Sequence, residues 1–217
     1  MRLLIQRTTI STKALDHLFQ VLTGSNITEL SLISTTSYFQ PKDPQTALTT
    51  LPTLLARTPA LKSITLHNLD LGTDQCFHIA QGLVMNAESG GKLRSLNLNQ
   101  NRIGTKGVQL ICEAMRDNHH VESLFLNGNG IDTDGAYALS KVLVSSSLRE
   151  LHVAENKIAS CGLAVIMEAI AKHNKKLKFL DIAYNVIDIG ILRALRQMLE
   201  KNSTLNYLSI SGLHKFN

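Results

Sequence analysis

The sequence has little that would build a disulfide-linked or aromatic core. Its 217 residues include no tryptophan, and aromatic residues make up 5% of them, while 44% are hydrophobic, which fits a core of leucine and isoleucine layers. The three cysteines, Cys76, Cys112 and Cys161, are odd in number and far apart. A disulfide framework is therefore not expected, and a reducing compartment is the better match. We expect Cys112 and Cys161 to be buried thiols in or near helices.

Signals for membranes, export and common chemistry are also missing. No stretch approaches the roughly 18 consecutive apolar residues of a membrane span, and the first apolar run is too short for a signal peptide. We therefore expect a cytoplasmic protein. The sequence contains no glycine-rich phosphate loop, C-x-x-C or H-E-x-x-H motif. His67 and His152 should lie about 14 Å apart on separate strands, too far to share a metal. We predict no catalytic residue, metal or cofactor.

What the sequence does contain is one unit written four times. The pattern L-x-x-L-x-L-x-x-N, or a close variant, recurs with its second leucine at Leu96, Leu124, Leu151 and Leu180, and a partial fifth copy has Leu208 there. These anchors are 28, 27, 29 and 28 residues apart. Self-similarity at such a period is typical of a solenoid, in which each repeat buries its apolar face against its neighbours.

Each position of the unit has a structural reason. Alternation of apolar and polar residues predicts a short strand, whose asparagine ends it and satisfies loop backbone groups. Seven residues after the anchor an isoleucine returns to the core, as at Ile103 and Ile131, and a glycine such as Gly107 or Gly135 follows. An amphipathic segment at helical spacing completes the unit. The unit is therefore strand, turn and helix.

We predict an α/β fold in a single domain, residues 1–217. Residues 93–217 form regular repeats, and residues 1–92 form irregular repeats with insertions. Asp43 and Pro44 are typical of a helix start, but Pro52 cannot lie inside a helix without breaking it, so two short helical pieces are expected there. About eight parallel strands should form the inner layer and seven helical connections the outer one. The strands are expected to start around Leu3, Leu30, Ile64, Leu96, Leu124, Leu151, Leu180 and Leu208.

The units from Leu93 to Leu208 resemble the ribonuclease-inhibitor subfamily of leucine-rich repeat proteins. The resemblance is carried by Leu96, Leu98, Asn101, Ile103 and Gly107, with copies at Leu124 and Leu151, and by a period near 28 with a full helix per repeat. It implies a curved, horseshoe-shaped solenoid whose concave sheet and adjoining loops bind a protein. The family also includes GTPase-activating proteins of Ran, actin-capping tropomodulins, and effectors that intracellular pathogens send into host cells.

The net charge of +5 raises the possibility of nucleic acid or an anionic membrane as a partner. The predicted inner face, however, has a net charge of −2, because two cations oppose four anions, and phosphate binding there would need lysine and arginine. Nucleic acid on the concave face is therefore disfavoured. The basic run from Lys172 to Lys178 follows a helix and is expected to be a solvated helix end. The charged residues of the inner face are Arg2, Arg7, Glu29, Glu150, Glu155 and Asp181.

Four outward positions on each of eight strands give 32 residues, enough for a standard interface of about 20–30 residues a side. Aromatic residues fall at four of them on the last four strands, and exposed aromatics are enriched at interfaces. Covering the sheet is an equally good explanation for any one of them. The candidate partner-binding residues are Asn97, Asn99, Phe125, Asn127, Glu150, His152, Glu155, Phe179, Asp181, Tyr184 and Tyr207.

We therefore predict a non-enzymatic module that binds a protein partner on its concave face. It would act as an adaptor in its own cell, or as an effector that occludes a protein in the cytoplasm of a host. The alternative is a GTPase-activating protein of the Ran-activating type that uses Arg102, a loop arginine next to Asn101, near the phosphates. An exposed edge on the first strand leaves self-association open.

Overall fold

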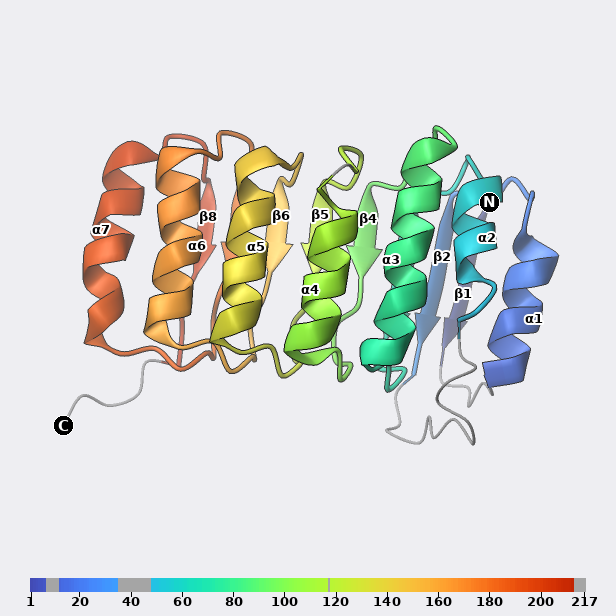
Figure 1. Ribbon diagram of the computed structural model, residues 1–217, viewed down its shortest axis with the longest axis horizontal. Coiled ribbons are helices and arrows are strands. Elements are labelled where there is room, and N and C mark those ends of the chain that lie inside the picture. The colour runs from blue at the N-terminus through green and yellow to red at the C-terminus, as the bar shows by residue number, and fades with distance from the viewer. Residues whose placement is uncertain (7–11, 35–47, 117, 213–217) are drawn as a thin grey trace.

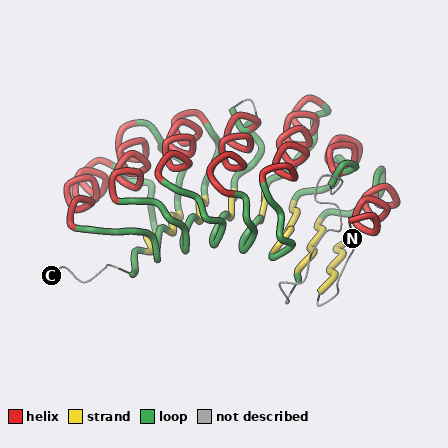
Figure 2. Tube along the Cα trace, turned by 60° about the horizontal axis from the view of Figure 1, so that its bottom comes forward, coloured by secondary structure: helices red, strands yellow, loops and turns green. Residues whose placement is uncertain are grey.

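The computed structural model describes residues 1–6, 12–34, 48–116 and 118–212. Eight strands form one sheet in which every neighbour pair is parallel and the spatial order equals the chain order. Helices lie in a row along one side of this sheet (Figure 1). Figure 2 shows the same arrangement as an arc, with helices in the outer layer and strands in the inner one. The predicted α/β leucine-rich repeat solenoid is confirmed.

The strands shorten along the chain, from five residues to three. They are β1 (Arg2–Gln6), β2 (Glu29–Ile33), β3 (Ser63–His67), β4 (Ser95–Asn97), β5 (Ser123–Phe125), β6 (Glu150–His152), β7 (Phe179–Asp181) and β8 (Tyr207–Ser209). The helices between them are α1 (Thr12–Leu22), α2 (Leu51–Arg57), α3 (Thr73–Glu88), α4 (Gly104–Ala114), α5 (Thr133–Ser145), α6 (Ser160–Lys172) and α7 (Leu192–Lys201), the last preceded by the 3-10 turn η2 (Ile189–Ile191).

The leucine anchors set the register of the sheet. Leu96 pairs with Leu124, and Leu124 pairs with Leu151, on adjacent parallel strands. These side chains are at most 1% exposed, as are the isoleucines that follow β4–β7, namely Ile103, Ile131, Ile158 and Ile187. The buried residues of all the repeats form one continuous hydrophobic core. Burial of each repeat against the next is the stabilisation that a solenoid requires.

The asparagine that ends each regular strand links two repeats. The buried Asn156 accepts hydrogen bonds through Oδ1 from the backbone N–H groups of Asn129 and Ile131, both at 3.0 Å. Its Nδ2 donates to the carbonyls of Leu126 and Val153, both at 3.0 Å. Asn101, Asn129 and Asn185 make equivalent bonds in their repeats. The predicted role of this asparagine in satisfying loop backbone groups is confirmed.

A second set of asparagines closes the opposite end of the repeats. In Asn174, Nδ2 donates to the Leu143 carbonyl at 2.8 Å, while Oδ1 accepts from the Leu177 N–H at 2.7 Å. Asn118 and Asn202 occupy the same place in their repeats. Each lies three residues before the first apolar position of the next unit. This N-x-x-L signal was present in the sequence but was not used.

Pro52 lies in the first turn of α2, where a proline costs no hydrogen bond, so it does not interrupt a helix; the other helical piece, expected to start at Asp43 and Pro44, lies outside the described residues. One prediction about an individual residue is corrected. Cys112 is buried, as expected, but Cys161 is exposed. Cys161 is the second residue of α6, and the phase of this helix turns Gly162 and Leu163 to the core instead.

Candidate protein-binding site on the concave face

The candidate residues lie in β4–β8 or within three residues after a strand of this group. In the described part of the sheet, β8 is an edge strand, so the surface formed by β5–β8 and their following loops, here called the carboxy-terminal concave surface, lies at one end of the arc. Among the described residues, three of the 32 positions expected to face outward are buried: Ser34 is 5% exposed, and Ala154 and Ala183 are each 4% exposed. None of these buried residues is among the eleven candidate residues. Of the candidates, Tyr184 and Tyr207 are the most exposed aromatic residues, at 62% and 51%.

Four rings form one continuous stack across β5–β8. The ring centroids of Phe125 and His152 are 4.4 Å apart, those of His152 and Phe179 4.5 Å, and those of Phe179 and Tyr207 4.2 Å. The interplanar angles are 24°, 21° and 10°, so each ring covers a face of the next. The stack therefore presents ring edges, rather than inner ring faces, to whatever lies against the sheet. Ring edges carry the positive end of the aromatic quadrupole.

His152 is the central polar member of this stack. Its side chain is only 15% exposed, and Nδ1 lies 3.8 Å from Oδ2 of Asp181, its register partner on β7. Burial lowers the pKa of His152, while the charges of Asp181 and Glu150 oppose that shift. The net direction is downward, so the neutral imidazole is favoured in the folded protein. Sequence reasoning treated His152 as a single inward histidine and did not predict its stacking.

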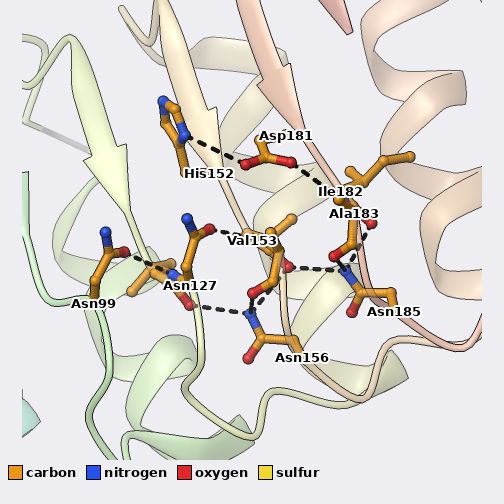
Figure 3. A network of polar contacts seen from close by, with 11 residues as sticks. Asn99, Asn127, His152, Val153, Asn156, Asp181, Ile182, Ala183 and Asn185 are labelled. Carbon is orange, nitrogen blue, oxygen red and sulfur yellow. Dashed lines mark hydrogen bonds and ion pairs between the residues drawn. The ribbon is translucent and has the colours of Figure 1, made fainter. Parts of the chain in front are cut away.

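The polar candidates Asn99, Asn127 and Asp181 each accept a side-chain-to-backbone hydrogen bond (Figure 3). Oδ1 of Asn99 accepts from the N–H of Asn127 at 2.7 Å, and Oδ1 of Asn127 accepts from the N–H of Ala154 at 2.8 Å. Oδ1 of Asp181 accepts from the N–H of Ala183 at 3.2 Å. Within the described residues neither asparagine Nδ2 has a partner, so both remain available as donors. Asn97 is used locally, accepting from the N–H of Asn99 at 3.0 Å.

From β3 to β8, the second residue after the second inward-facing apolar residue of each repeat has a positive φ. Gln100 has φ 57°, Glu155 56° and Tyr184 53°, while Gly128 and Gly212 occupy the same place in their repeats with φ 66° and 75°. The residue at this position has a left-handed backbone conformation, which glycine adopts without strain, so glycine can replace larger residues there. The side chains at this position therefore line the loop edge of the concave face.

Glycine at position 128 has a further consequence for the site. The side chain of Gln100 passes over Gly128, where a Cβ atom would lie 2.6 Å from it, and its Nε2 donates to Oε2 of Glu155 at 2.9 Å. Glu155 is thus held by a residue two repeats away. Tyr184, in contrast, has no ring contact with the stack in the described structure, so the four predicted aromatics are not one cluster: His152 replaces Tyr184 in it.

One pair of opposite charges on the concave face is an ion pair, with Nε of Arg2 3.0 Å from Oε2 of Glu29. Glu155 accepts a hydrogen bond from the neutral amide of Gln100, and Asp181 lies beside His152. Arg7 lies outside the described residues. Arg102 is on the loop edge, with Nε 2.7 Å from Oδ1 of Asp70 in the preceding repeat. Its side chain is 76% exposed, and its guanidinium is held by that carboxylate.

Burial sets the chemistry of the thiols away from this face. It raises the pKa of Cys76 and of Cys112 to about 12, so both remain protonated at neutral pH. Across residues 1–6, 12–34, 48–116 and 118–212, no three His, Cys, Asp or Glu side chains come together as metal ligands. No helix in these same ranges is long and apolar enough to cross a membrane.

Comparison with known proteins identifies the repeats. Residues 92–112, 117–140, 144–167 and 173–195 match the family described as Leucine Rich repeat. Mouse NACHT, LRR and PYD domains-containing protein 9B is 26% identical over 210 residues, which is 96% of this chain and 20% of that protein. Human NACHT, LRR and PYD domains-containing protein 13 is 26% identical over 155 residues, 70% of this chain and 14% of that protein. Pig ribonuclease inhibitor is 24% identical over 163 residues, 74% and 35% of the two chains.

Solved structures share the fold. Actin-binding site 2 of leiomodin-1 superposes with a TM-score of 0.54 at 19% identity, over 63% of this chain and 78% of that one. The TLR13 chain of the TLR13–ssRNA13 complex gives a TM-score of 0.51 at 16% identity, over 88% and 27% of the two chains. This chain therefore spans about a third or less of the length of the sequence relatives named above.

The protein is a leucine-rich repeat protein. Within that class it is of the ribonuclease-inhibitor-like type, as its repeat pattern predicted. Leucine-rich repeat domains generally mediate protein–protein interaction, and ribonuclease-inhibitor-like relatives are generally binding modules without catalysis.

Proposed function

We propose that the carboxy-terminal concave surface binds a protein partner. The observation that carries this proposal is the four-ring stack of Phe125, His152, Phe179 and Tyr207 on the inner side of an arc. Rigid aromatic residues supply large contact area at little cost in side-chain entropy, and interface anchors are enriched in them. Because the rings already order one another, a partner would not have to immobilise them.

Polar groups beside the stack supply the directional contacts that such an interface needs. The free Nδ2 groups of Asn99 and Asn127 can each donate one or two hydrogen bonds to a partner. Glu150 and Glu155 lie on either side of the rings along β6 and its following loop and can accept. A face with apolar anchors surrounded by polar groups has the anatomy of a protein interface.

Affinity capture with matched variants tests the proposal. The wild-type chain, a concave variant (Phe179→Ala with Tyr207→Ala) and a convex control (Phe77→Ala with Tyr137→Ala) would be used as bait in cell lysate, with mass spectrometry as the readout. Phe77 and Tyr137 are 57% and 43% exposed and lie on α3 and α5 in the outer layer, so the control removes one phenylalanine and one tyrosine from the other side.

We expect a protein captured by the wild type and the control but lost from the concave variant. Loss of two anchors that each cost more than about 1–2 kcal/mol would weaken binding by at least about tenfold. Equal capture by both double variants would refute the proposal. An adaptor and an effector that occludes a host protein predict the same surface, and the captured protein distinguishes them.

A further inference from the structure

A row of basic side chains borders the concave face at the amino-terminal ends of the strands. The residue directly before each strand from β3 to β7 is Lys62, Arg94, Glu122, Arg149 and Lys178 in turn. Backbone hydrogen bonds join them in that order, from the Arg94 N–H to the Lys62 carbonyl at 2.8 Å and then at 2.7 Å for each later step. The four cations of this row, Lys62, Arg94, Arg149 and Lys178, are called the basic rim.

The rim has a net positive charge that remains available to a ligand. Arg94 and Arg149 share the carboxylate of Glu122, with contacts of 2.7 Å and 3.4 Å, and their side chains are each 59% exposed. Four cations and one anion leave a charge of +3 on the row. Lys62 and Lys178 are exposed and have no ion pair within the described structure. Lys92, Lys175 and Lys176, on the loops just before the strands, are exposed as well.

The rim adjoins the aromatic stack. Lys178 is followed directly by Phe179, and Arg149 is followed by Glu150, which pairs with Phe179 in the sheet. An anionic ligand on the rim would therefore lie next to ring edges, whose partial positive charge also favours anions. The positive charge of the rim and the orientation of the ring edges therefore both favour an anionic group.

We propose that the basic rim binds an acidic stretch of a protein partner, extended across the starts of β3–β7. The inference rests on the proposed function, because it names the chemistry of the partner held by the same part of the molecule. Four steps of about 4.8 Å between strands give a row about 19 Å long, which about six residues of extended chain would span. Alternate carboxylates of such a chain can reach the rim while the other side chains face the rings.

Two observations favour an acidic protein over a nucleic acid. The faces of His152 and Phe179 are covered by neighbouring rings on both sides, so bases cannot stack between them, and such stacking is the usual source of single-strand binding. Glu122 also divides the row into two pairs of cations. Its carboxylate, at the centre of the row, would repel a continuous line of phosphates. Discrete carboxylates can avoid that position.

Fluorescence anisotropy with defined probes tests the inference. A fluorescein-labelled hexaglutamate peptide would be titrated at about 50 mM salt, where the screening length exceeds about 10 Å. The rim variant is Arg94→Gln with Arg149→Gln and Lys178→Gln. The control is Arg102→Gln with Lys106→Gln and Lys157→Gln, which makes the same change in charge on exposed residues that follow the strands, in loops and in the first turn of α4. Circular dichroism would verify that both variants fold.

We expect the rim variant to weaken peptide binding by about tenfold, equivalent to about 1.4 kcal/mol, and the control to weaken it by less than about twofold. No binding by the wild type, or an equal loss in both variants, would overturn the inference. So would tighter, rim-dependent binding of a thymidine oligonucleotide with six phosphates, because that result assigns the rim to nucleic acid.

The same variants separate this inference from the proposed function. The Phe179→Ala, Tyr207→Ala protein should keep most of its affinity for hexaglutamate, because the cations are intact, yet lose the captured partner. If peptide binding ignores the rim while capture still depends on the rings, the rim inference fails and the concave-face function stands. If peptide binding depends on the rim cations while partner capture does not depend on the rings, the rim inference stands and the concave-face function fails.

Discussion

Removing the amide of Asn156 should be one of the most costly single truncations in the repeats. The side chain is 7% exposed, and its Oδ1 is the acceptor for two backbone N–H groups, while its Nδ2 is the donor to three carbonyls. In Asn156→Ala the N–H groups of Asn129 and Ile131 lose their partner. Each buried donor left unsatisfied costs about 1–3 kcal/mol.

Two of the three carbonyl groups that accept from Nδ2 of Asn156 keep another hydrogen bond in the variant. That of Val153 keeps a bond from Nδ2 of Asn185 at 2.9 Å, and that of Ala154 keeps one from the N–H of Gly128 at 3.0 Å. We therefore attribute most of the penalty to the two donors and expect the free energy of unfolding to fall by about 3–5 kcal/mol. Because the bonds join adjacent repeats, the loss should appear in the whole cooperative transition rather than in one loop.

Urea unfolding followed by circular dichroism measures this loss. Asn206→Ala is the matched control. Asn206 is the exposed residue directly before β8, and it donates a hydrogen bond to the Lys178 carbonyl through its backbone N–H, which alanine retains. The control should stay within about 0.5 kcal/mol of the wild type. A loss below about 1 kcal/mol in Asn156→Ala, or one equal to the control, would refute the reasoning that this amide connects the repeats.

Three other predictions follow. In Gly135→Ala the new methyl group would lie 2.4 Å from Cγ2 of the buried Ile131, and overpacking should lower the unfolding free energy by about 1–3 kcal/mol in the same urea assay; an unchanged value would contradict this close contact. Because the pKa of His152 is lowered in the folded state, unfolding should become easier as the pH falls below about 6.5, and His152→Phe should reduce that loss between about pH 7.5 and pH 5.5; an equal slope in both proteins would show that His152 is not responsible. Since Asp70 holds the guanidinium of Arg102, neither the wild type nor Arg102→Ala should accelerate GTP hydrolysis by a Ran-type GTPase, and an acceleration that disappears in the variant would favour the GTPase-activating alternative.

Much of the fold could be predicted because the repeat fixes three features at once. The spacing of Leu96, Leu124 and Leu151 places one strand in each unit, their alternation with polar residues identifies the buried side, and their equivalent position in each unit sets the register. Asn101 and its copies had a predictable role, because a buried amide at a strand end can satisfy loop backbone. The helix-end asparagines, such as Asn174, were overlooked because they precede the unit as it was defined.

The site was less predictable, because one contact of the ring stack runs diagonally across the sheet, although Phe125 and His152, and Phe179 and Tyr207, are register partners. In the register, Phe179 lies opposite Glu150 rather than His152, so alignment of the repeats does not predict that the rings of His152 and Phe179 touch. Their contact depends on side-chain rotamers. The rim was missed for another reason: Arg94 and Arg149 fall just before the strands, at positions that the pattern assigned to neither a strand nor a helix.

Cys161 shows the limit of helical periodicity near a helix start. It is the second residue of α6, and the burial of Gly162 and Leu163 leaves it on the outer side of the first turn. Sequence spacing alone did not define that phase, because the exact first residue of a helix is the least certain feature of a pattern.

Site-specific photo-crosslinking tests the central claim most directly. Benzoylphenylalanine would replace Tyr184, which is 62% exposed beside the stack without belonging to it, and in a separate protein Tyr137, which is 43% exposed on α5 in the outer layer. If the concave surface binds the partner, irradiation should join the partner to position 184 and not to position 137. Crosslinks from position 137 alone would place the partner on the helices and contradict the account.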